Sequence, residues 1–125
     1  MPVRHGSSAT VEMTVTDADT AISFRSGDVP VLATPRLVAL FEEAAVVALG
    51  GQLTAGQTSV GMRVQVDHLA PTAVGSTVTA EATLERVDGR RLLFTVAAHD
   101  PRGLVGAGKV TRVVVDTEHF LDRLN

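Results

Sequence analysis

The chain has 125 residues, of which 45% are hydrophobic and 20% are charged, and its formal net charge is -3 at pH 7. This length and composition fit a single compact domain, residues 1–125, with a modest core, and they exclude two domains or general disorder. The negative charge argues against nucleic-acid binding, which needs a basic surface to replace phosphate counterions.

The sequence contains no cysteine, which excludes a thiolate nucleophile and a thiolate-ligated metal and suits a reducing cytoplasm. No apolar run reaches the roughly eighteen residues that span a bilayer, and the first ten residues lack the apolar core of a signal peptide. Neither a metal-ligand cluster nor a glycine-rich phosphate loop is present. We therefore expect a soluble, cytoplasmic protein with no membrane partner, no metal and no cofactor.

The first elements are read from short alternating segments. In residues 9–19, ATVEMTVTDAD, Val11, Met13 and Val15 share one face, which predicts a strand. The short AISF segment that ends at Phe24 is also predicted to be a strand. Residues 25–32 have no periodicity, so we expect a loop that leads into a helix.

A helix is predicted from Thr34 to about Leu49. Thr34 is expected to cap it, because a threonine hydroxyl accepts a backbone N–H, and the following Pro35 has no N–H to lose. Two glycines at 50–51 end the helix. The apolar side chains gather on one side of the helical wheel: Leu37, Phe41, Ala44, Ala45 and Ala48.

Two adjacent acids on this helix point in different directions. At about 100° per residue, Glu42 lies at the margin of the apolar stripe, whereas Glu43 points away from it. We therefore expect Glu42 to be the acid that faces the interior.

A later strand carries a histidine on its apolar face. In residues 60–68 the apolar side chains alternate with polar ones, and His68 continues the apolar set: Val60, Met62, Val64 and Val66. Three long antiparallel strands are predicted to follow, with reversals at Asp88–Gly89 and at residues 100–103.

The last element is predicted to be a short helix. Thr117 is expected to cap it, with Phe120, Leu121 and Leu124 on its inner side. One helix followed by antiparallel strands predicts an α+β protein with the hotdog fold, in which a curved antiparallel sheet wraps a central helix.

Four blocks carry a resemblance to a known family. VLATPRLVALFEEAA, GQTSVGMRVQVDHLAP, VDGRRLLFTVAAHD and GAGKVTRVVV, in this order and spacing, resemble the hotdog thioesterases related to fluoroacetyl-CoA thioesterase. The resemblance implies that Thr34, Glu42 and His68 form the catalytic set. It also implies substrate contacts from the backbone amide of Gly61 and from Arg112.

These residue types suit the hydrolysis of a small acyl-CoA thioester to the free acid and CoA. Glu42 would attack the carbonyl or activate water, and His68 would assist departure of the thiolate. Thr34 would hydrogen-bond Glu42 or the substrate. The sequence leaves both routes open, and it also leaves open whether the acid and the imidazole come from one protomer or from two.

The sequence differs from the family at a position that affects which substrate can be predicted. The fluoroacetyl-specific enzyme is associated with an aromatic lid before the helix, whereas no aromatic residue lies between Phe24 and Phe41. We therefore do not carry fluoroacetate selectivity over. Basic residues are candidate partners for the phosphates of CoA: Arg63, Arg86, Arg90 and Arg91.

A hotdog protomer leaves a sheet edge uncovered, so we expect a homodimer, with a tetramer as a further option. Two other functions stay open: an acyl-thioester hydratase or dehydratase, and a non-catalytic acyl-CoA-binding protein. Each catalytic candidate also has a structural explanation, since Thr34 can be a helix cap, Glu42 a surface carboxylate and His68 a satisfied core histidine.

Overall fold

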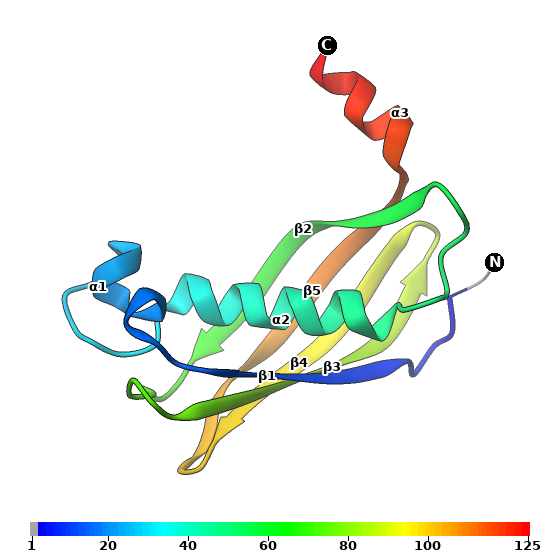
Figure 1. Cartoon of the computed structure of the whole chain (residues 1–125). Coiled ribbons are helices and arrows are strands. Elements are labelled where there is room, and N and C mark those ends of the chain that lie inside the picture. The colour runs from blue at the N-terminus through cyan, green and yellow to red at the C-terminus, as the bar shows by residue number, and fades with distance from the viewer. Residues whose placement is uncertain (1–2) are drawn as a thin grey trace.

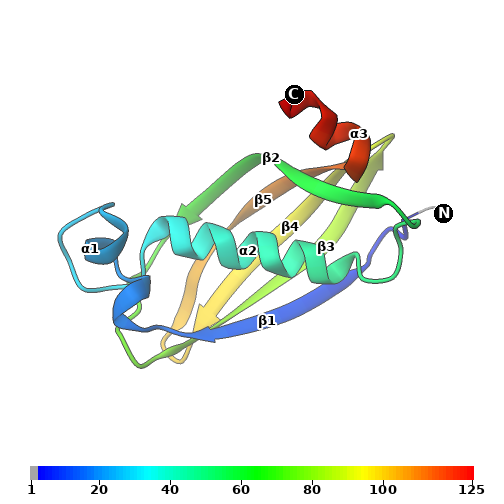
Figure 2. The ribbon, with the colours of Figure 1, turned by 45° about the horizontal axis from the view of Figure 1, so that its top comes forward.

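A five-stranded antiparallel sheet curls around one long helix in the computed structural model, which describes residues 3–125 (Figure 1). The first two residues of the predicted domain 1–125 lie outside the described residues. The strand order is β1-β3-β4-β5-β2, with β1 and β2 at the two borders (Figure 2). The strands are β1 (Ser8–Thr14), β2 (Gln57–His68), β3 (Thr77–Asp88), β4 (Arg91–Asp100) and β5 (Gly103–Asp116). The α+β hotdog architecture is confirmed.

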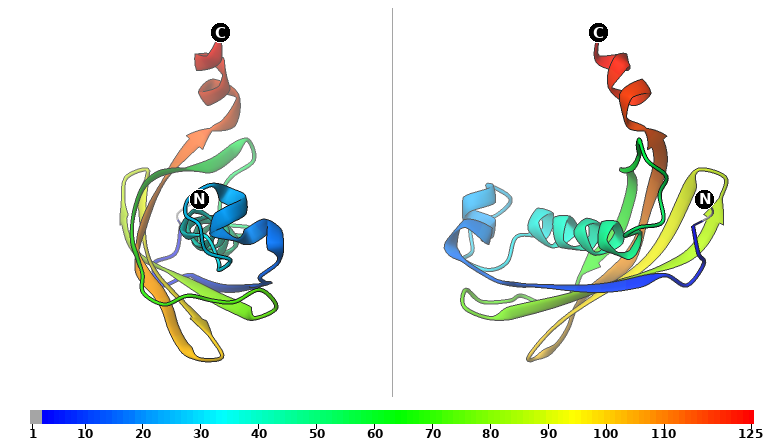
Figure 3. Two further views of the ribbon diagram at one scale, coloured as in Figure 1. Left: turned by 90° about the vertical axis from the view of Figure 1, so that its left-hand side faces the viewer. Right: turned by 45° about the vertical axis from the view of Figure 1, so that its right-hand side comes forward.

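The long helix α2 (Thr34–Ala48) lies on the concave side of the sheet, which wraps around it (Figure 3). Leu37, Leu40 and Phe41 are completely buried and pack with Leu84 and Phe94 of the sheet. Three small residues on the same side of the helix, Ala44, Ala45 and Ala48, are also buried. The predicted apolar stripe is confirmed, and burial of these large side chains supplies most of the driving force for folding.

The prediction that AISF is a strand is wrong. Residues Ala21–Phe24 form the short helix α1, which follows the 3₁₀ turn η1 (Asp17–Asp19). The Thr20 hydroxyl accepts a hydrogen bond from the Ser23 backbone N–H, which satisfies an N–H at the start of the helix. The predicted loop at residues 25–32 is confirmed, because only the isolated bridges at Val31 and Leu32 interrupt it.

The C-terminal helix is confirmed, but its predicted inner side is wrong. α3 (Thr117–Leu121) and the 3₁₀ turn η2 (Asp122–Leu124) continue β5 beyond the sheet (Figures 1 and 3). Leu121 is 49% exposed and Leu124 is 81% exposed, because the core formed by the described residues does not extend to them. Thr117 is the first helical residue, not the cap, which is Asp116.

The prediction that Val60 and Met62 share a face with His68 is also wrong. Gly61 pairs with Arg112 on β5, but Arg63 pairs with Thr111, so the register leaves Met62 without a partner. One extra residue reverses the alternation of side chains along a strand. Gly61 and His68 therefore face α2, whereas Met62 is 46% exposed on the outer face.

Both predicted reversals are confirmed. Asp88 pairs with Arg91, so the first turn consists of Gly89 and Arg90, and Gly89 has a φ of 61°. Asp100 pairs with Gly103 in the second. Among residues 3–125, no helix is long and apolar enough to cross a membrane.

Candidate active site

Thr34 and His68 form the first half of the site. Ala33 is the N-cap of α2 and Thr34 is the first helical residue, so the prediction that the Thr34 hydroxyl caps the helix is wrong. That hydroxyl lies 2.7 Å from Nδ1 of His68 instead. The hydrogen bond joins the start of α2 to the end of β2 and fixes the orientation of the imidazole ring.

His68 presents its second nitrogen to the interior. Nε2 is buried and has no hydrogen-bond partner among residues 3–125. Burial lowers the pKa of His68 from its ordinary value of 6.5, and a backbone hydrogen bond at Ala70 opposes this shift. The ring is therefore neutral at neutral pH, with an unsatisfied nitrogen that is ready to accept or donate a proton.

A cavity of about 320 Å³ adjoins this pair. Thr34 and His68 line it together with parts of the loop 25–32 and of residues 69–71, and no phenylalanine contributes to its wall.

Glu42 and Arg112 form the second half of the site. Nη1 of Arg112 donates a hydrogen bond to Oε2 of Glu42 at 3.1 Å. Arg112 is 7% exposed and also donates to the Ser59 hydroxyl at 2.8 Å and to the Ser59 carbonyl oxygen at 2.9 Å. A buried guanidinium held by three hydrogen bonds fixes the position of the carboxylate. The Glu42 side chain is 35% exposed, which leaves its carboxylate accessible.

Gly61 brings the backbone of β2 against this carboxylate. A Cβ atom at position 61 would overlap Oε2 of Glu42, so only glycine allows the observed approach. The unpaired Met62 follows directly, and such an irregularity disrupts the ladder of backbone hydrogen bonds. Backbone amides that are free of the ladder can bind negative charge on a reacting oxygen.

The structure therefore brings the five predicted residues together in two groups, Thr34 with His68, and Glu42 with Gly61 and Arg112. Glu42 faces the interior and Glu43 is exposed, as predicted. Eight residues of helix, about 12 Å, separate Thr34 from Glu42, and Glu42 does not line the cavity beside His68. Within one chain, the acid and the imidazole do not meet.

Ser59 was missed by sequence reasoning. It precedes Gly61 by two residues and lies on the same face of β2, where it binds Arg112 through both its hydroxyl and its carbonyl. The spacing of two is visible in the sequence. It became informative only when the register of β2 against β5 placed Gly61 and Arg112 opposite each other.

Comparisons with known proteins agree on one family. The model of the family described as "FlK: Fluoroacetyl-CoA-specific thioesterase" matches residues 15–118. The fluoroacetyl-CoA thioesterase of Streptantibioticus cattleyicolor is 42% identical over 90 residues, which span 72% of this chain and 65% of that protein.

Solved structures show the same fold. A variant of the fluoroacetyl-CoA-specific thioesterase FlK in complex with fluoroacetate and CoA superimposes with a TM-score of 0.88 at 35% identity, covering 94% of this chain and 98% of that one. A hot-dog-like protein from Thermanaerovibrio acidaminovorans gives a TM-score of 0.89 at 33% identity, with coverages of 96% and 89%. The fold and the comparisons thus define a hotdog-fold protein of a thioesterase family, and the chain spans just under two thirds of the length of the curated relative that it matches. The chain belongs to the fluoroacetyl-CoA-specific thioesterase family.

Replacing Gly61 with Ala tests the position of the carboxylate. The added methyl group forces the end of the flexible Glu42 side chain to move, and a displacement of about 1 Å can reduce turnover about 100-fold. We expect the rate of thioester hydrolysis to fall, while the unfolding midpoint in urea stays close to that of the wild type. A fully active G61A variant would show that the carboxylate needs no such placement.

The pH dependence of His68 follows from its lowered pKa. The ring should titrate below pH 6.5 in an NMR experiment, and kcat/KM should retain its full value down to that lower pH. Because the folded state resists protonation, the free energy of unfolding should fall as the pH drops below 6.5, and His68→Gln should reduce this dependence. A ring that titrates above 6.5 would contradict the burial of Nε2.

Proposed function

We propose that the protein hydrolyses a small acyl-CoA thioester to the free acid and CoA. The observation that carries this proposal is the Glu42 carboxylate, which Arg112 holds directly against the Gly61 backbone. This arrangement offers an oxygen nucleophile or base next to backbone amides, as acyl transfer requires. Membership of a thioesterase family supports the same reaction.

Two routes use these residues. In the first, an oxygen of Glu42 attacks the thioester carbonyl and the CoA thiolate leaves. A mixed anhydride remains on Glu42, and water then cleaves it. In the second, Glu42 accepts a proton from a water molecule that attacks the carbonyl directly, and the C–S bond then breaks to release the free acid and the CoA thiolate. In both routes the neutral His68 accepts a proton at Nε2 and later returns it, and the Thr34 hydroxyl holds the ring in position.

We place the acyl group in the cavity beside His68, which is open to solvent on one side in the single chain and which a second protomer would narrow. Its wall contains no phenylalanine, so we propose no selectivity for fluoroacetate. Arg112, whose guanidinium is already engaged by Glu42 and Ser59, acts by placing the acid and not by holding the distant end of CoA. The absence of cysteine fits a cytoplasmic enzyme.

A homodimer would complete the site. Strand β2 borders the sheet and, within residues 3–125, pairs only with β5, so its other edge is open along 12 residues in the described part of the chain. An open edge of this length invites pairing with a second copy. Glu42 and His68 are separate within one chain, but Glu42 contacts β2 at Gly61 and His68 is the last residue of β2. We therefore propose that Glu42 of one protomer works with Thr34 and His68 of its partner.

Glu42→Gln tests the catalytic acid. We expect free-thiol release from short acyl-CoAs to fall about 100-fold or more, because the amide can neither attack nor accept a proton. Glu43→Gln is the matched control, since Glu43 is the exposed neighbour on the same helix, and it should keep full activity. Equal loss in both variants would contradict the assignment. Enoyl hydration without thiol release, or tight binding without either reaction, would favour the hydratase or the non-catalytic binder.

A mixing experiment tests the shared site. E42Q and H68Q are each expected to be inactive, but a heterodimer of the two contains one site with both native residues if the site crosses the interface. An equal mixture after subunit exchange should then recover about a quarter of the wild-type activity. If Glu42 and His68 of the same chain work together, every site in the mixture lacks one of them and no activity returns.

A further inference from the structure

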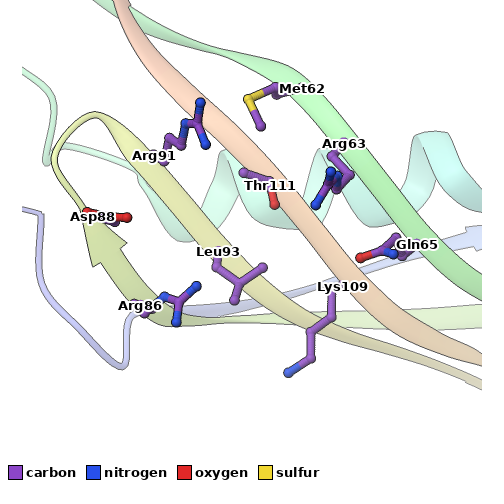
Figure 4. Close-up of a pocket in the computed structure, with 9 residues that line it drawn as sticks. All are labelled: Met62, Arg63, Gln65, Arg86, Asp88, Arg91, Leu93, Lys109 and Thr111. Atoms are coloured by element: carbon purple, nitrogen blue, oxygen red, sulfur yellow. The ribbon is translucent and has the colours of Figure 1, made fainter.

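A second pocket lies on the outer face of the sheet, on the side away from α2. It has a volume of about 280 Å³ and is lined by residues of β2, β3, β4 and β5 (Figure 4). Four of its side chains are cationic, Arg63, Arg86, Arg91 and Lys109, and one is anionic, Asp88. This concentration of positive charge stands out on a chain whose net charge is -3.

The strand register explains why the four cationic side chains line the same pocket. Arg63 pairs with Thr111, Thr111 with Leu93, and Leu93 with Arg86, so these residues form one row across four strands. The row spans about 14 Å, because neighbouring strands are about 4.8 Å apart. Arg91 and Lys109 lie two residues from Leu93 and Thr111 on their own strands, so they share the outer face, and Figure 4 shows the four cations around this central pair.

Two irregularities of the sheet turn arginines to this face. The register leaves Met62 unpaired before Arg63 on β2, and it leaves Glu85 unpaired before Arg86 on β3. With regular alternation, both arginines would point to the side occupied by α2. Each extra residue turns the arginine that follows it to the outer face. Arg63 and Arg86 then lie at the two ends of the same row.

The three arginines are not held in ion pairs within the described residues, although Asp88 lines the same pocket. The pKa of the nearby Glu85 is lowered chiefly by its hydrogen bond with Lys109, and the charge of Arg86 helps to lower it. Among residues 3–125, Arg63, Arg86 and Arg91 form no ion pair, whereas Lys109 pairs with Glu85 at 2.7 Å. Guanidinium groups match the oxygens of phosphate in planar, bidentate hydrogen bonds. Thr111 adds a hydroxyl, and Leu93 provides an apolar floor.

We propose that this outer-face pocket binds the phosphate groups of a phosphorylated small molecule. The nucleotide end of CoA and a free phosphorylated metabolite offer the same chemistry, and the experiment below distinguishes them. A second copy is a poorer occupant, since stacking two such faces about a two-fold axis brings like charges together. Nucleic acid is also a poorer one, because the basic row is short and the rest of the chain is acidic.

The test compares an Arg63→Gln/Arg91→Gln double variant with an Arg4→Gln/Arg102→Gln control, whose arginines are exposed outside the pocket. Inorganic pyrophosphate and adenosine 3′,5′-bisphosphate serve as calorimetric probes. We expect both to bind the wild type and the control, and to bind the double variant about tenfold more weakly, because two charge-assisted contacts are lost. No turnover is needed, so a failed hydrolase assay and a failed binding site are distinguishable.

Steady-state kinetics then identifies the source of the phosphate. If the double variant raises KM for acetyl-CoA without changing kcat, and leaves the phosphate-free thioester acetyl-pantetheine unaffected, the pocket holds the nucleotide end of CoA. If probe binding is lost but both KM values stay unchanged, the ligand is a free phosphorylated molecule. The proposal is overturned if neither probe binds the wild type, if the double variant binds as well as the control, or if only a DNA duplex binds.

Discussion

The ion pair between Arg112 and Glu42, set against the side-chain-free backbone of Gly61, is the constraint on which the functional site depends. It links three elements, since Glu42 comes from α2, Gly61 from the border strand β2 and Arg112 from β5. Arg112 is buried and is also hydrogen-bonded to Ser59, so the position of its guanidinium does not depend on the contact with Glu42 alone. A carboxylate held in this way needs no reorganisation when it meets a carbonyl.

The same strand that carries Gly61 also carries His68, and this explains why the site has two halves. α2 contacts β2 at two separate places: Thr34, at the start of the helix, meets His68 at the end of the strand, and Glu42, in the middle of the helix, meets Gly61. The open edge of β2 lies beside both halves. Pairing of that edge with a second copy would protect it and bring complementary halves from two chains together.

Sequence periodicity predicted the fold well where a single rule governed the outcome. The apolar stripe of α2 determined which acid faces inward, and the turns at Gly89 and at residues 100–103 marked the strand ends. Periodicity failed at Met62, because one extra residue reverses the faces of a strand and leaves no local signal. It failed again for Leu121 and Leu124, because the pattern of a helix does not reveal whether the chain folds back beneath it.

The candidate site was predicted largely through its resemblance to a family, and the structure adds what no residue pattern contains. Thr34 before Pro35 has the composition of a helix cap, and only the tertiary contact with His68 shows that its hydroxyl is used elsewhere. Ser59 and the outer-face arginines depend on the strand register, which local sequence does not specify. The two irregularities thus affect both faces of the sheet, Gly61 on one side and Arg63 with Arg86 on the other.

A crystal structure of the Glu42→Gln variant with bound acetyl-CoA would test the central claim most directly. We expect a thioester carbonyl carbon in van der Waals contact with the side chain at position 42, its oxygen facing backbone amides near Gly61, and an imidazole of His68 in the same cavity. A thioester bound away from position 42, with its carbonyl in contact with neither Gly61 nor Arg112, would contradict it.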